Sequence, residues 1–216
     1  MVSAEPPEIE VHVAARIREA RMMGLKLRRD CALFIGLCCL LSSGVDALAE
    51  SREPIRVGVG PATSQQILAH VTAQALMKAG YKVDFIELEP GTDDAAQVDM
   101  IASGSVHVHP SLAAADAEAE LNDALAANRV ISLGNLIKSD ADASTLKVAS
   151  AITNRSWPGA VKVLRTMAFP PEDLDRMAQN VEAGRSTVDR VVDEWMKGNP
   201  SSWKRWITAS RNWMTP

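Results

Sequence analysis

The chain has 216 residues, of which 47% are hydrophobic and 23% are charged, which is enough for one domain or two small ones. Its 23 Lys and Arg against 27 Asp and Glu leave a net charge of −4, and no basic run offers the positive stripe that a nucleic-acid surface needs. The absence of any low-complexity tract excludes wholesale disorder and fibrous architectures.

A secretory signal peptide is predicted over residues 22–49. A basic stretch containing Arg28 and Arg29 precedes an apolar run at residues 31–41, and small residues follow. We expect cleavage after Ala49 and a periplasmic mature protein. The apolar run is shorter than the roughly 20 residues of a transmembrane helix, so an uncleaved anchor is the lesser alternative.

Residues 1–21 carry acidic side chains where an export signal begins with basic ones. They are interpreted as lying upstream of a true start at Met22 or Met23, or as a short cytoplasmic extension. The mature chain would contain no cysteine, which excludes disulfides, thiolate metal ligands and thiol catalysis. All three cysteines lie within the predicted signal: Cys31, Cys38 and Cys39.

The first part of the mature chain, residues 55–137, is predicted to alternate strands and helices. Gly80 should end the first helix in the left-handed conformation, and Pro110 should stop the third strand because proline cannot donate to a ladder. Alternation of this kind indicates an α/β fold with a mostly parallel sheet and flanking helices. Strands are expected over residues 55–59, 81–88 (largely buried), 105–109 and 130–133, and helices from 63 or 64 to 79, from 91 to 103 and over 113–128.

The second part of the mature chain is predicted to be helical over residues 155–213, after a polar loop at 138–144 and a last strand at 146–152. Helices are expected over residues 159–169, 171–183, 186–197 and 200–213. Four of the five tryptophans in this tail cluster near its end, and we interpret them as anchors that dock its helices onto the sheet. The alternative is an aromatic cage or a partner surface. These residues are Trp195, Trp203, Trp206 and Trp213.

Two stretches together resemble a known family. Residues 55–112 contain a strand, a turn, a long helix, the sequence GYKV and a His-Pro pair, and are similar to the first lobe of substrate-binding proteins of ABC importers for glycine betaine, proline betaine and choline. Residues 160–207 resemble the carboxyl-terminal end of that family through Trp195, the Asn199-Pro200 pair and the tryptophans that follow. The resemblance implies one lobe of a type II periplasmic-binding-protein fold, shortened, because too few residues separate the two stretches for a second lobe.

The resemblance also implies a function, namely the exported solute-binding component of an importer that serves osmoprotection. Its partners would be an ABC permease in the membrane and a small quaternary-ammonium solute, with no cofactor, metal or nucleic acid. The family holds the ammonium group in a cage of aromatic rings, and neither stretch shows such a cage. The alternative is a degenerate, non-transporting interaction protein that keeps the lobe but has lost the cage. The ligand-binding residues implied are Pro61, Ala62, Thr63, Ser64, His109 and Pro110.

Other chemistries are weaker interpretations of the same residues. Thr63 and Ser64 could simply cap the first helix. His107 and His109 stand two apart, a spacing that suits metal binding, but no third ligand is close in the sequence, which favours structural histidines. No nucleophile elbow or catalytic triad spacing is present, so we predict no enzyme activity.

Overall fold

The computed structural model describes residues 53–113, 117–137 and 145–211. These residues lie in one compact unit, residues 50–216. The predictions for residues 1–21, for the signal at 22–49, for the loop at 138–144 and for Trp213 concern residues outside the described ranges. The strands are β1 (Ile55–Val59), β2 (Val83–Glu87), β3 (Val108–Ala113), β4 (Val130–Ser132) and β5 (Thr145–Ser150). The helices are α2 (Thr63–Ala79), α3 (Asp94–Ser103), α4 (Glu118–Ala126), α5 (Ala151–Ser156), α6 (Pro158–Thr166), α7 (Pro171–Glu182), α8 (Val188–Gly198) and α9 (Pro200–Arg211).

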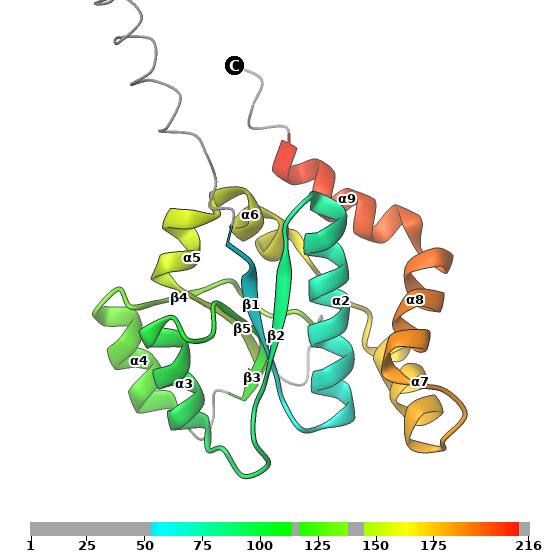
Figure 1. The fold of residues 1–216 in the computed structure, drawn as a ribbon, viewed down its shortest axis with the longest axis horizontal. Coiled ribbons are helices and arrows are strands. Elements are labelled where there is room, and N and C mark those ends of the chain that lie inside the picture. Colours follow the sequence, from blue (N-terminus) through cyan, green and yellow to red (C-terminus); the bar gives the residue numbers. More distant parts are fainter. Residues whose placement is uncertain (1–52, 114–116, 138–144, 212–216) are drawn as a thin grey trace, which may run out of the picture. The chain divides into compact units, whose positions relative to one another are not determined.

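The strands form one sheet in the order β2-β1-β3-β5-β4 (Figure 1). β1 runs parallel to both β2 and β3, whereas β5 runs antiparallel to both β3 and β4. Four strands therefore point one way and β5 points the other. The predicted α/β class, with a mostly parallel sheet, is confirmed.

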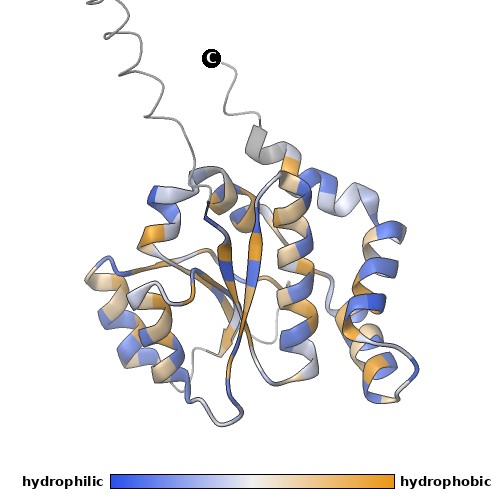
Figure 2. Cartoon of the chain, in the orientation of Figure 1, coloured by the Kyte–Doolittle hydropathy of each residue, from blue (hydrophilic) through white to orange (hydrophobic). Residues whose placement is uncertain are grey.

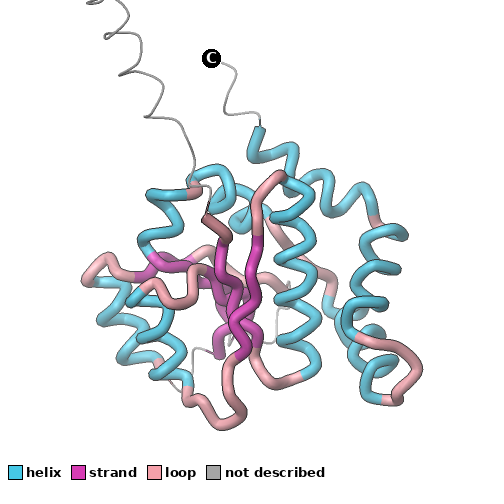
Figure 3. Tube along the Cα trace, in the orientation of Figure 1, coloured by secondary structure: helices cyan, strands magenta, loops and turns pink. Residues whose placement is uncertain are grey.

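Helices cover both faces of the sheet, as Figure 3 shows, and each face has its own apolar cluster. On one face, Ile55 and Val57 of β1 pack with α2 and with the carboxyl-terminal helices. On the other face, Val148 of β5 packs with α3 and α4. Hydrophobic residues follow the central strands and α2 in Figure 2, as expected for elements at the centre of a layered fold.

The predicted helical tail is also confirmed, and it packs against the sheet domain through α2, which contacts α6, α7, α8 and α9. Trp195 and Trp206 are buried, and their rings stack with centroids 5.9 Å apart. Trp195 also lies 4.5 Å from Phe169 between ring centroids. Trp203 is partly buried, and its indole N–H donates to the carbonyl of Met196 at 2.8 Å. These three tryptophans therefore serve as structural anchors.

One charged side chain is buried between the sheet and the end of α6. Lys147 of β5 is 2% exposed, and its Nζ donates to the carbonyls of Leu164 and Met167 at 2.7 and 2.6 Å. The last carbonyls of a helix lack hydrogen-bond donors within that helix, and at the end of α6 the Lys147 ammonium group donates to them. Burial lowers the pKa of Lys147 from 10.5 to about 8.

The structure corrects two strand predictions. Pro110 does not stop β3 but lies inside it, because the pairing with β5 shifts between His109 and Leu112 and this irregularity needs no ladder N–H from proline. The strand predicted at 81–88 is not largely buried, because β2 is an edge strand and its Phe85 is 41% exposed.

Three helix predictions also change. The helix expected from residue 113 begins at Glu118, since β3 occupies the residues up to Ala113. Residues 151–156 form the short helix α5, which was not predicted, so the preceding strand ends at Ser150. The helix expected over 159–169 ends at Thr166. Gly80 ends α2 in the left-handed conformation, with φ of 103°, as predicted.

Candidate functional site

All six predicted ligand-binding residues lie at the carboxyl edge of the sheet. β1 and β3 are parallel neighbours, with Val57 paired to Val108, so their carboxyl ends meet at this edge. The turn after β1 leads there into α2, and β3 carries its His-Pro pair beside it. We call residues 60–64 and 109–111 the site edge. β4 ends and β5 begins at the same edge, because β5 runs in the opposite direction.

The start of α2 has no hydrogen bond from an N-cap side chain. The prediction that Thr63 or Ser64 caps this helix is wrong: Ala62 is the N-cap and has no side-chain oxygen. Gln65 Oε1 accepts the N–H of Ala62, at 3.3 Å. The first N–H groups of a helix have no acceptor within it and carry the positive end of the helix dipole. This turn is therefore suited to an anionic group such as a carboxylate.

The turn is also accessible and sterically defined. Pro61 and Ala62 are exposed, and Thr63 and Ser64 are half-buried. A Cβ atom at Gly60 would overlap the end of the Gln65 side chain, which would have to move to admit a larger residue. The backbone of the turn therefore lies open to a ligand.

His109 contributes a neutral, buried ring to the site edge. It is 1% exposed, and burial lowers its pKa to about 4. Its Nδ1 accepts the N–H of Ser111 at 3.4 Å, which leaves the proton of the neutral ring on Nε2. Nε2 and Ser111 Oγ are both buried without a hydrogen-bond partner in the described structure. A neutral ring does not repel a cationic ligand.

His107 has different partners and does not combine with His109 into a metal site. Its Nδ1 accepts the backbone N–H of Arg56 at 3.0 Å, and its ring lies 4.7 Å from that of Trp157 between centroids. Burial, followed by the nearby Arg56 cation, lowers the pKa of His107. The described residues contain no group of three potential metal ligands. Both histidines fit the structural interpretation.

The described connections at the site edge carry exposed acidic side chains and none of the aromatic residues Phe, Tyr and Trp. The connections at this edge, over residues 60–62, 88–93, 133–137 and the described part of 113–117, contain no Lys, Arg, Phe, Tyr or Trp. An edge lined by one sign of charge favours approach of the opposite charge. Combined with the helix start, this arrangement fits a small zwitterion. The exposed carboxylates at the end of β2, before α3 and at the start of α4 are Glu87, Glu89, Asp93, Glu118 and Glu120.

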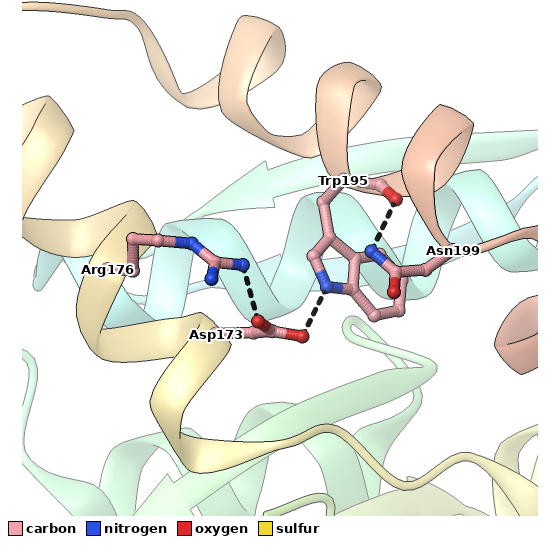
Figure 4. Close-up of polar contacts among 4 residues, drawn as sticks. All are labelled: Asp173, Arg176, Trp195 and Asn199. Carbon is pink, nitrogen blue, oxygen red and sulfur yellow. Dashed lines mark hydrogen bonds and ion pairs between the residues drawn. The ribbon is translucent and has the colours of Figure 1, made fainter.

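The helical tail has a separate shallow pocket of about 280 Å³ between α7 and α8. Figure 4 shows that Asp173 binds both Arg176 and the indole N–H of Trp195, which it accepts at 2.8 Å. Asn199 donates to the Trp195 carbonyl at 3.0 Å. The polar edge of Trp195 is therefore used within the fold.

The resemblance seen in the sequence is confirmed by comparison with known proteins. Residues 53–148 match the family model of the substrate-binding domain of ABC-type glycine betaine transport systems. No curated protein sequence matches the chain significantly. No helix among the residues described above has the length and apolarity needed to span a bilayer.

Two solved structures have a similar fold. One is lactococcal OpuAC in its closed, liganded conformation with glycine betaine, with a TM-score of 0.59 and 11% identity over 72% of this chain and 99% of that one. The other is an ABC-transporter choline-binding protein in complex with choline, with a TM-score of 0.60 and 8% identity over 74% of this chain and 97% of that one. The matched family and structures are substrate-binding proteins, not enzymes. These findings support a solute-binding role.

Proposed function

We propose that this chain is the exported solute-binding component of an ABC importer and that its site edge holds a small zwitterionic quaternary amine of the glycine betaine type. After removal of the signal, the protein would capture this solute in the periplasm and deliver it to a membrane permease. The observation that carries the proposal is the uncapped start of α2 within an acidic surround. The amide donors would hold the ligand carboxylate, and the acidic surround would attract the ammonium end.

The ligand contacts follow from this arrangement. The backbone of Pro61 and Ala62 and the first turn with Thr63 and Ser64 would surround the carboxylate. His109 and Pro110 would form the neighbouring wall on β3. Because the described structure contains one sheet, a ligand held here would be covered on one side only, and we expect weaker binding than two closing lobes would provide.

Calorimetric titration of residues 50–216 with glycine betaine, choline and proline tests the proposal. We expect saturable binding of glycine betaine and weaker binding of choline, which lacks the carboxylate. If none of the three solutes binds, the second candidate is favoured, a non-transporting interaction protein. The observation that supports this second candidate is the lack of Phe, Tyr and Trp in the described connections at the site edge.

An Ala62→Asp variant tests the role of the helix start directly. A carboxylate at the N-cap would accept the same N–H groups that we assign to the ligand, so we expect glycine betaine binding to be lost. The same change should stabilise the fold by about 1 kcal/mol, as favourable caps do. Loss of binding with a gain in stability cannot be attributed to misfolding.

Thr187→Asp is the matched control, because Thr187 is the exposed N-cap of α8 and already accepts a backbone N–H. It adds the same charge at another helix start and should leave binding unchanged. Undiminished binding in Ala62→Asp would show that the ligand does not use the start of α2.

A further inference from the structure

The amino edge of the sheet, opposite the site edge, gathers basic side chains from several elements. β1 and β2 begin at this edge, with the Ile55 N–H donating to the Lys82 carbonyl at 2.8 Å. α2 ends there, α5 follows the end of β5, and α9 lies against the end of α2 (Figure 1). We call the exposed cations of these elements the basic edge: Lys78, Lys82, Arg155, Lys204 and Arg205.

Two of these cations are organised around an aromatic ring. Lys78 Nζ lies 5.0 Å and Lys204 Nζ 5.7 Å from the centroid of Trp203. The ring is partly exposed, and its N–H is already used at the carbonyl of Met196. Met77, in the last turn of α2, is 46% exposed. The basic edge therefore combines ammonium groups with apolar side chains that reach solvent.

Among the described residues, the ion pairs His70–Asp189, Arg176–Asp173 and Arg190–Glu194 do not involve the basic edge. Glu53 and Asp84 are the carboxylates nearest in the chain to the starts of β1 and β2. In a chain of net charge −4, positive charge is thus concentrated at the edge opposite the acidic site edge.

We propose that the basic edge binds the anionic surface of a lipid bilayer. Lysine and arginine attract anionic headgroups, while Trp203 and Met77 are side chain types that enter the interfacial region. The position of the chain start favours a membrane over other polyanions: β1 begins at this edge, directly after the predicted export signal. The edge of the sheet at which the chain enters the fold after that signal is therefore the edge that contains the cations.

This orientation has a consequence for the site edge, although the proposal does not depend on the proposed function. With the basic edge on the bilayer, the start of α2 and the His-Pro pair of β3 face away from the membrane. A molecule bound in this way keeps its candidate site open to solution for capture, and it would have to leave this orientation before it delivers a ligand to a permease.

Vesicle co-sedimentation of the full chain tests the proposal. The quantity measured is the preference for vesicles containing phosphatidylglycerol over vesicles of phosphatidylcholine alone, and the leader is the same in every variant. Lys82→Glu combined with Lys204→Glu should reduce this preference by more than roughly 30-fold, because each lysine near an anionic surface contributes about 1 kcal/mol and the anionic headgroups repel the new carboxylates. Raising the salt concentration should weaken wild-type binding to the anionic vesicles.

Arg185→Glu combined with Arg190→Glu is the matched control, with the same change in charge at exposed positions of the tail. It should retain the wild-type preference. Lys82→Gln with Lys204→Gln, which introduces no new charge, should show a smaller loss than the glutamate pair and guards against misfolding of that pair. Equal losses in the Lys82/Lys204 pair and the control pair, or equally tight binding of wild type to duplex DNA, would overturn the proposal.

Discussion

Replacing Lys147 with methionine tests how the fold accommodates a buried cation. Methionine has a similar length and no charge, so Lys147→Met removes the titratable group from its place beside the end of α6. Because burial lowers the folded-state pKa of Lys147 to about 8, the unfolded chain holds this proton more tightly than the folded chain does. Wild type should therefore gain stability relative to the variant as the pH rises above 8.

The size of this gain follows from the two pKa values. A change from 10.5 in the unfolded chain to about 8 in the folded chain corresponds to about 3 kcal/mol, at about 1.4 kcal/mol for each pH unit. Below pH 8 both states carry the proton and the difference between wild type and variant is constant. Between pH 8 and 10.5 the folded lysine is neutral while the unfolded one is still charged, and the gain accumulates.

Urea unfolding between pH 7 and 10.5 measures the effect as a difference in the free energy of unfolding between wild type and Lys147→Met. Subtracting the variant removes the contribution of all other titrating groups. Lys82→Met is the control, since it makes the same replacement at an exposed lysine. A difference for Lys147→Met that does not change with pH would refute the assignment of a buried, destabilised ammonium group.

Two further changes probe the packing that positions the site. Gly104→Ala should lower the free energy of unfolding by more than about 2 kcal/mol, since φ is +79° and the new Cβ would lie 2.5 Å from Ile152 Cδ1. Gly184→Ala, at φ +67° with open space around the new Cβ, should lower it by about 1–2 kcal/mol. Similar losses for the two variants in thermal unfolding would contradict the overlap with Ile152. Trp195→Phe should cost about 1–3 kcal/mol in urea unfolding, because it leaves the Asp173 carboxylate without its indole donor, and an unchanged midpoint would argue against that hydrogen bond.

The order and type of most elements could be predicted from the sequence because local signals and global packing agree. Gly80 ends α2 and begins the turn into β2. The spacing of the apolar residues in α2 matches the helix face that is buried. The tail helices could be predicted for the same reason, since prolines and glycines mark their ends.

The deviations arise where tertiary context overrides a local rule. Pro110 is a strand breaker in isolation, but the irregular pairing of β3 with β5, remote in the sequence, gives it a place within a strand. Nor does the apolar pattern of β2 reveal that this strand lies at the sheet edge, because strand order depends on the whole topology.

The sequence also predicts one part of the candidate site and not another. Placement of the turn after β1 next to the His-Pro pair follows from two parallel strands and was predictable. The missing side-chain cap at Ala62 and the burial of His109 were not, because both depend on side-chain positions that no spacing specifies.

The position of β5 has a further consequence for how the sheet is assembled and altered. β4 pairs only with β5 among the described strands, and β5 separates it from β3, so β4 has no place in the sheet until the chain has turned back. During vectorial emergence from the amino terminus, the sheet is completed by the strand that arrives last. The antiparallel hairpin also places the end of β4 beside the start of β5, which makes this junction a graft point where an extra domain can be inserted or removed while every strand pairing is kept.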